Sequence, residues 1–120
     1  LAPVVCAREA DALYDFCWFP FMSSLDAATS VFLSTAKDQP IHMWDAFTGS
    51  RRAQYAYFTD AEELTAAYCV AFSSTGDSIF GGFNNAVREW KLSRPGRTCV
   101  SYPTYRRSNK VRTMNYDYAF

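Results

Sequence analysis

The chain has 120 residues, within the range of one domain, and its 49% hydrophobic and 18% aromatic content excludes a disordered chain. The formal charge is zero, yet residues 1–87 hold four basic against ten acidic side chains, and residues 88–112 hold eight basic side chains against Glu89 alone. Such a basic segment can bind a polyanion, although basic loops are also common on ordinary protein surfaces. No apolar run reaches the roughly 18 residues of a membrane span, and the N-terminus lacks a signal-peptide pattern.

The first half of the chain predicts four strands in sequence. Residues 14–19 form an apolar strand pattern, and residues 20–29 form a longer loop. Residues 30–45 predict a hairpin, because an apolar run, a short polar turn and an alternating second run follow one another. A tight turn at 45–49 then leads to a fourth strand at 51–57.

The second half repeats this order after an acidic connection at 59–64, for which a helical turn is one expectation. The predicted elements are a strand at 65–72, a turn at 73–77, a hairpin at 78–91, a turn at 93–96 and a strand at 97–102. Gly76 is free to adopt positive φ in the first of these turns. The main local alternative is an amphipathic helix over 60–72, where alanine and leucine are common.

The two halves align on Trp44 and Trp90, which gives a period of 90 − 44 = 46 residues. In both copies a polar residue, Asp38 or Asn84, stands six positions before the tryptophan. Two sets of four short strands predict an all-β chain with two blades of a β-propeller. We expect boundaries at 1–12 for an N-terminal segment, 13–58 and 59–102 for the blades, and 103–120 for a diverged basic tail.

Several motifs resemble one family of WD-repeat proteins. Trp44-Asp45 is a WD dipeptide followed by a Thr48-Gly49 turn, and residues 71–76 resemble the usual link between the first and second strands of a blade. Together with residues 14–19, 22–24, 40–49, 63–67, 82–84 and 94–97, these motifs resemble the telomerase Cajal body protein family over about residues 12–100. The chain departs from the pattern at Lys91, which replaces the second acid, and matches little beyond Pro103.

This resemblance implies a fold and a role. Members of the family are seven-bladed WD-repeat propellers that bind small Cajal body RNAs, including telomerase RNA, and direct them to Cajal bodies in the nucleus. The chain would then be a propeller fragment of about two four-stranded blades, with these RNAs and ribonucleoprotein proteins as partners. The alternative is a general WD-repeat scaffold for protein–protein interaction without RNA binding.

Two groups of residues are candidates for these roles. The tryptophans are expected in the core with buried partners for their indole N–H groups, and Asp38 and Asn84 are expected to accept hydrogen bonds in turns. The full structural set is Asp38, Trp44, Asp45, Gly49, Gly76, Asn84 and Trp90. The hypothesised RNA-binding set is Arg94, Arg97, Arg106, Arg107 and Lys110, with Tyr102 or Tyr105 stacking on unpaired bases.

No catalytic or metal site is predicted. The four cysteines form no CxxC pair, three of them lie in apolar surroundings expected of core thiols, and His42 is the single histidine. Ser73, Ser74 and Thr75 lack the G-x-S-x-G elbow and an available base. We therefore expect no enzyme activity, cofactor, membrane or small-molecule substrate, and a reducing compartment. Because the chain begins with Leu1, we expect a fragment or processed product that associates through uncovered blade faces.

Overall fold

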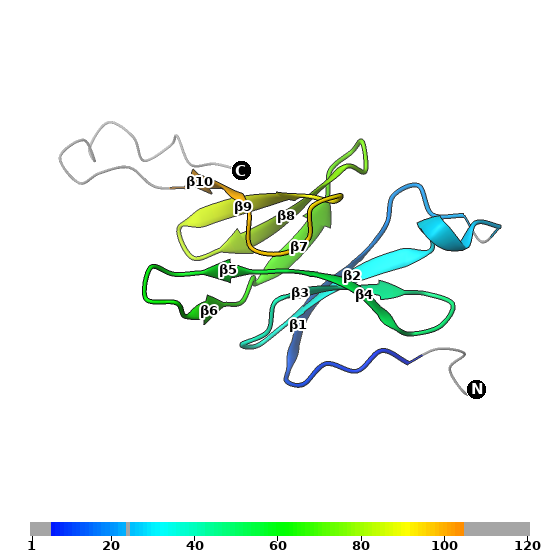
Figure 1. Ribbon diagram of the computed structural model, residues 1–120, viewed down its shortest axis with the longest axis horizontal. Coiled ribbons are helices and arrows are strands. Elements are labelled where there is room, and N and C mark those ends of the chain that lie inside the picture. The colour runs from blue at the N-terminus through cyan, green and yellow to red at the C-terminus, as the bar shows by residue number, and fades with distance from the viewer. Residues whose placement is uncertain (1–5, 24, 105–120) are drawn as a thin grey trace.

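The structure, a computed structural model, describes residues 6–23 and 25–104, which form two four-stranded antiparallel sheets and one two-stranded sheet (Figure 1). These residues contain one short 3₁₀ helix, η1 (Ala27–Thr29), and no α-helix. The alternative of an amphipathic helix over 60–72 is therefore wrong. No helix in the described ranges is long and apolar enough to cross a membrane.

The first sheet is a meander whose strands pair in chain order. Its strands are β1 (Leu13–Trp18), β2 (Val31–Ala36), β3 (Ile41–Asp45) and β4 (Arg51–Tyr55). The β2–β3 hairpin pairs Leu33 with Met43, and this pair contributes to the apolar core. The hairpin predicted over 30–45 and the fourth strand after the turn at 45–49 are confirmed.

The second sheet has the same meander order. Its strands are β7 (Cys69–Phe72), β8 (Ser78–Phe83), β9 (Ala86–Lys91) and β10 (Val100–Pro103). The hairpin predicted over 78–91 is confirmed, whereas the two outer strands begin later than the sequence pattern suggests. This sheet completes the second of the two four-stranded units that a WD-repeat propeller fragment requires.

Both late starts have a cause elsewhere in the chain. Thr65, predicted as the first residue of a strand over 65–72, instead lies with Leu64 of the predicted connection in β6 (Leu64–Thr65), which pairs with β5 (Tyr57–Phe58) between the two sheets. Before β10, the Gly96 N–H donates to the Gln54 carbonyl at 2.9 Å, and the Gly96 carbonyl accepts from the Ala56 N–H at 2.8 Å. The segment before β10 is therefore held along the first sheet and cannot extend the second.

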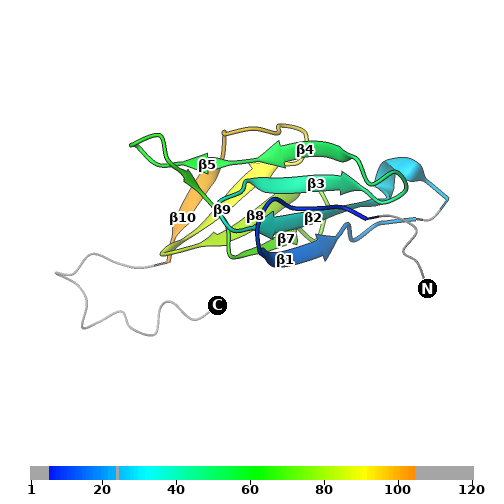
Figure 2. The same ribbon diagram turned by 90° about the horizontal axis from the view of Figure 1, so that it is seen from below.

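The two sheets lie side by side in Figure 1, overlap in part in the turned view of Figure 2, and share one core. The first sheet contributes Leu33, Ile41 and Tyr55, and the second contributes Ile79 and Trp90, all five almost completely buried. Burial raises the pKa of the Tyr55 hydroxyl to about 12. Apolar burial of this kind is the main term that holds the sheets together.

Polar contacts also join the two sheets. The Asp15 carboxylate accepts from the Val70 N–H at 3.0 Å, which ties β1 to β7. The Thr35 hydroxyl donates to the Ala67 carbonyl at 2.7 Å. The Tyr55 hydroxyl donates to the Leu92 carbonyl at 2.8 Å. Because these groups have partners across the interface, their burial carries little desolvation cost.

The two tryptophans face the same way around the stack. Trp90 lies in the core between the sheets, whereas Trp44 neighbours Met43 in β3 and so points to the opposite face of the first sheet. Trp90 therefore lies on the face of the second sheet that points toward the first sheet, and Trp44 lies on the equivalent face of the first sheet, away from the second. This is the relation between radially stacked blades, and the two separate strand orders exclude a single mixed sheet.

The cysteines are only partly core residues. Cys17 and Cys99 pack against the core, whereas Cys69 is exposed because it lies on the face of β7 opposite to Val70, away from the first sheet. The prediction of three core thiols is wrong for one of them. All four cysteines are free.

Candidate interaction surfaces

The tryptophans are anchors of the two sheets. Trp44 is 5% exposed, and its indole N–H donates to the Ser34 hydroxyl at 2.7 Å. Trp90 is fully buried, and its indole N–H donates to the Ala56 carbonyl at 3.3 Å. Both are structural side chains with no free polar atom to offer a ligand.

A buried polar network continues from Trp44. The Ser34 hydroxyl donates to the Glu9 carboxylate, and His42 Nδ1 lies 2.8 Å from Glu9 Oε1. The side chains of His42 and Glu9 are only 2% and 7% exposed. A carboxylate at this depth requires such partners, so Glu9 fixes residues near the N-terminus on the first sheet. The sequence pattern predicted no catalytic or metal site at His42 and gave no signal for Glu9.

The turn after β3 is held by one carboxylate. Asp45 accepts from the N–H groups of Phe47 at 2.8 Å and Thr48 at 3.0 Å, and it pairs with Arg52 at 2.7 Å. These bonds hold the pKa of Asp45 below its usual range, with the Thr48 N–H as the largest cause and Arg52 next. Gly49 closes the turn at a φ of 74°.

The remaining structural candidates also lie in turns. Gly76 has a φ of 78°, and a Cβ there would lie 3.0 Å from the Phe21 ring. Asp38 is exposed in the β2–β3 turn at a φ of 59°, and no bond to its carboxylate is found in the described ranges. Asn84 is exposed in the β8–β9 turn, where the following Asn85 has a φ of 65°.

The basic candidates differ in their surroundings. Arg94 is exposed, whereas Arg97 pairs with Glu62 at 2.8 Å and lies 4.0 Å above the Phe58 ring. The other candidates, Arg106, Arg107 and Lys110, and the stacking candidate Tyr105 lie outside the described residues. The structure thus places only Arg94 and Arg97, and Arg97 already has a counter-charge.

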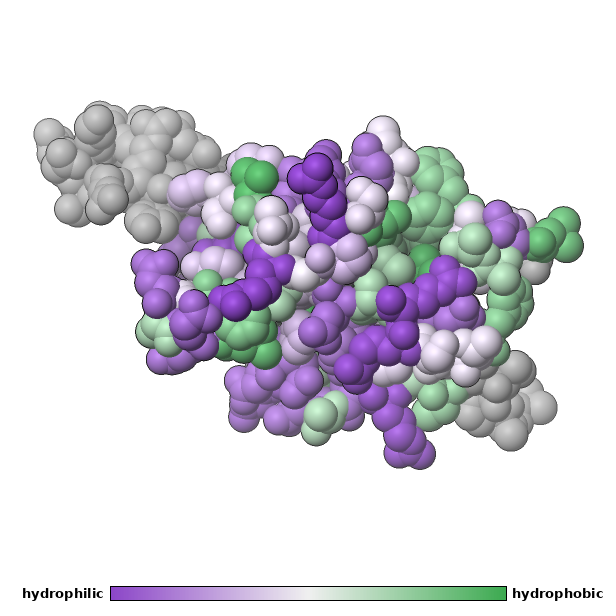
Figure 3. All heavy atoms as spheres, viewed as in Figure 1, coloured by the Kyte–Doolittle hydropathy of each residue, from purple (hydrophilic) through white to green (hydrophobic). Residues whose placement is uncertain are grey.

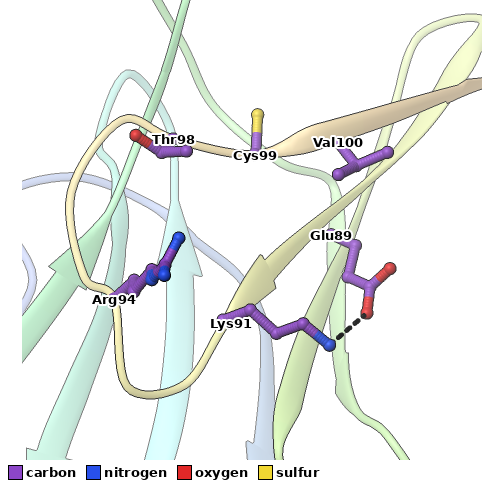
Figure 4. A pocket seen from close by; sticks show the side chains of 6 residues that line it. All are labelled: Glu89, Lys91, Arg94, Thr98, Cys99 and Val100. Carbon is purple, nitrogen blue, oxygen red and sulfur yellow. Dashed lines mark ion pairs between the residues drawn. The ribbon is translucent and has the colours of Figure 1, made fainter.

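Arg94 borders a pocket of about 240 Å³ beside β9 and β10 (Figure 4). Lys91 in this pocket lies 3.8 Å from Glu89 Oε2, and the Tyr102 hydroxyl donates to Glu89 at 2.8 Å. The bond from Tyr102 is the largest cause of a lowered pKa for Glu89, which favours its ionised form. The pocket therefore carries both signs of charge. Burial raises the pKa of the Cys99 thiol on its rim, although the nearby Arg88 cation opposes this, so the thiolate is disfavoured.

A second hollow of about 290 Å³ lies at the β8–β9 turn and has no carboxylate in its lining. Arg88 lines it, with its guanidinium 3.5 Å from the Tyr57 ring centre and 4.8 Å from that of Phe83. The other lining residues are Asn84, Asn85, Ala86, Ser101 and Pro103. The sequence pattern counted Arg88 within the basic run but did not select it as a site residue.

Exposed apolar side chains gather in two places. Phe16 and Trp18 are 56% and 48% exposed on the face of the first sheet that also carries Trp44. Phe21, Met22 and Leu25 are exposed in the β1–β2 connection, which forms the apolar end at the right of Figure 3. Contiguous patches of exposed apolar side chains mark contact surfaces, whereas apolar side chains exposed singly are common.

No protein-family model matches the chain. Among curated proteins, the chain is 45% identical to "Telomerase Cajal body protein 1" of Bos taurus and 43% identical to that of Homo sapiens. Each match spans 105 residues, which are 88% of this chain and 19% of the relative. The homolog of Drosophila melanogaster is 42% identical over 95 residues, which are 79% of this chain and 18% of the relative. The chain therefore spans about a fifth of the length of these curated relatives, and the resemblance inferred from its motifs is confirmed.

Proposed function

We propose that the chain, as a relative of telomerase Cajal body protein 1, supplies two neighbouring blades to a non-catalytic WD-repeat scaffold that binds small Cajal body RNA. Telomerase RNA is included among these RNAs, and the scaffold directs the ribonucleoprotein to Cajal bodies in the nucleus. The observation that carries the proposal is the 45% identity over 88% of the chain. The relatives' printed name, "Telomerase Cajal body protein 1", supports an association with telomerase and the Cajal body.

The geometry supports a binding role for the ends of the strands. Two stacked sheets leave their connecting turns at the edges, where Arg94 is exposed and Arg88 lines a hollow without carboxylates. Arginine pairs with phosphate through a planar fork and also stacks on bases. RNA that presents unpaired bases and phosphates is chemically suited to such edges.

A protein–protein scaffold is the second candidate. The pairing of Arg97 with Glu62 and of Lys91 with Glu89 reduces the net positive potential at this edge. The exposed apolar end at the β1–β2 connection offers a contact surface of a different kind. These observations favour protein partners for that end of the molecule.

Recovery of partners from cells separates the two functions. The whole protein that carries these blades is immunoprecipitated with and without nuclease, and the recovered RNAs are sequenced. We expect enrichment of small Cajal body RNAs, and of ribonucleoprotein proteins whose recovery falls after nuclease. A partner set without these RNAs that is insensitive to nuclease would replace RNA binding by protein scaffolding.

A charge reversal tests the edge itself. Arg94→Glu is compared with Lys37→Glu, which reverses an exposed charge in the β2–β3 turn instead. Affinity for telomerase RNA is measured across salt concentrations, and we expect weaker binding and a smaller salt slope for Arg94→Glu only. Equal affinities and slopes for both variants would remove Arg94 from the interface.

A further inference from the structure

We infer that Arg88 and the β8–β9 turn form a binding site for a single phosphate group of an RNA strand. The inference deepens the proposed function, on which it rests, by assigning the contact to the hollow lined by Asn84, Asn85, Arg88 and Ser101. This hollow is named the Arg88 site below.

The first observation is the way Arg88 is held. Its guanidinium lies 3.5 Å from the ring centre of Tyr57, on the connection between the sheets, and 4.8 Å from that of Phe83 in β8. Two aromatic rings from different elements therefore fix the cation in place, and cation–π attraction favours that position. A positioned guanidinium loses less side-chain entropy when it binds an anion than a solvated one does.

The second observation is the missing counter-charge. No ion pair or hydrogen bond joins the Arg88 guanidinium to any residue within 6–23 or 25–104, and its Nε atom is buried without a partner. Arg97, by contrast, is paired with Glu62. The cation–π contacts offset part of the desolvation cost of this partly buried cation, and a bound anion would offset more of it.

The third observation is the composition of the hollow. Asn84 and Asn85 offer side-chain amides, Ser101 offers a hydroxyl, and none of the six lining residues is acidic. Amide N–H and hydroxyl groups donate to phosphate oxygens, and an arginine supplies the charge. The pocket beside Arg94 lacks this character because Glu89 lines it.

Phosphate of RNA is favoured over a carboxylate or a small anion by the surroundings. The hollow has a volume of about 290 Å³ and is bordered by exposed turn residues, so a strand can pass across it while one phosphate enters. Asparagine amides can in addition bond to base edges next to that phosphate.

Two variants and one matched control test the site in the whole protein. Arg88→Met keeps an apolar stem between the rings but removes the charge. Ser101→Glu places a carboxylate at the rim of the hollow. Ser101 is exposed in β10 and pairs with Arg88 across the strands, so the change disturbs little packing. Ser74→Glu adds the same charge in the exposed turn between β7 and β8, which is not part of the Arg88 site. Thermal melting of each variant establishes that it is folded.

Binding of labelled telomerase RNA is measured across salt concentrations, with inorganic phosphate and a phosphoserine peptide as separate ligands. We expect about a tenfold loss of RNA affinity for Arg88→Met and for Ser101→Glu, and none for Ser74→Glu. The salt slope for Arg88→Met should fall by about 0.7, the value for one single-strand phosphate.

The failures of the two proposals are distinguishable. If the wild-type protein binds RNA and Ser101→Glu binds it equally well, the Arg88 site is wrong while the proposed function stands, even if Arg88→Met is unfolded. If the wild-type protein binds the phosphopeptide at the Arg88 site but no RNA, the RNA assignment and the proposed function both fall. If Arg88→Met or Ser101→Glu loses binding of inorganic phosphate but keeps the wild-type affinity for RNA, the assignment of the Arg88 site to RNA is also overturned.

Discussion

Replacement of Trp90 by alanine tests whether the two sheets stabilise each other. The side chain is fully buried in the core between the sheets, and its ring centre lies 6.0 Å from that of Phe83. Its indole N–H reaches the Ala56 carbonyl on the connection that follows β4. The variant therefore removes apolar contacts to both sheets and one hydrogen bond between them.

The expected loss of stability follows from the buried area. A buried tryptophan removes about 150–250 Å² from water, and at about 25 cal/mol per Å² this corresponds to about 4–6 kcal/mol. Alanine retains a small part of that area, and substitutions of this kind cost about 3–5 kcal/mol. The bond to Ala56 is long at 3.3 Å and adds little. We expect the free energy of unfolding to fall by about 4 kcal/mol, a large share of the about 5–15 kcal/mol of a typical domain.

Urea unfolding followed by circular dichroism measures this loss. Phe47→Ala is the control, because Phe47 is 51% exposed in the turn after β3 and should contribute less than about 1 kcal/mol. A loss below about 1 kcal/mol for Trp90→Ala, or equal losses for the two variants, would show that the sheets do not depend on a shared core.

Three further predictions concern pH, packing and association. The pKa of Asp45 is lowered from 3.8, chiefly by the Thr48 N–H and then by Arg52, so this carboxylate stabilises the fold above its unfolded pKa and loses that effect as pH falls through the folded value. Asp45→Asn should therefore flatten the decline of the urea midpoint below about pH 4, and an unchanged decline would contradict this. Gly81→Ser should lower the melting temperature, with a cost of about 1–3 kcal/mol, because its Cβ would lie 3.2 Å from Ile41 Cδ1; unchanged melting would refute the close contact. The 120-residue chain alone should associate through its exposed blade faces, and sedimentation of a monomer with a sharp, concentration-independent thermal transition would contradict that.

The fold was predictable where local rules decide it. The two hairpins and the turn at Gly76 follow from alternation and turn chemistry within about twenty residues. The first residues of β7 and β10 were not predictable, because they depend on pairing between segments that are distant in the sequence. The bond between Gly96 and Gln54 joins residues that no local pattern relates.

The candidate site was less predictable, since charge pairing occurs in space. Arg97 stands beside a Pro-Gly turn and suggests a free guanidinium, yet its partner Glu62 is 35 residues away in the chain. Arg88 stands within a strand and suggests an ordinary solvated charge, yet Tyr57 on the preceding connection covers it. Neither contact leaves a trace in spacing or composition.

The two sheets repeat the same strand order, but the side-chain hydrogen bonds of their tryptophans differ. In the first sheet, Trp44 bonds to Ser34 of the neighbouring strand, and Glu9 and His42 extend this bond into a buried network. The registers place Gly81 at the corresponding position of the second sheet, where no hydroxyl is available. The two equivalent tryptophans must therefore satisfy their N–H groups in different ways.

That difference makes the contact between the sheets specific. Without a side chain at position 81, Ile41 of the first sheet approaches until its Cδ1 is 3.2 Å from where a Cβ would stand, and Trp90 bonds across to Ala56. A sheet with serine at this position could not accept Ile41 so closely without displacing it. The contact at Gly81 and Trp90 therefore differs from the pattern of the first sheet in both shape and hydrogen bonding, and a side chain at position 81 would have to displace Ile41 or its neighbours.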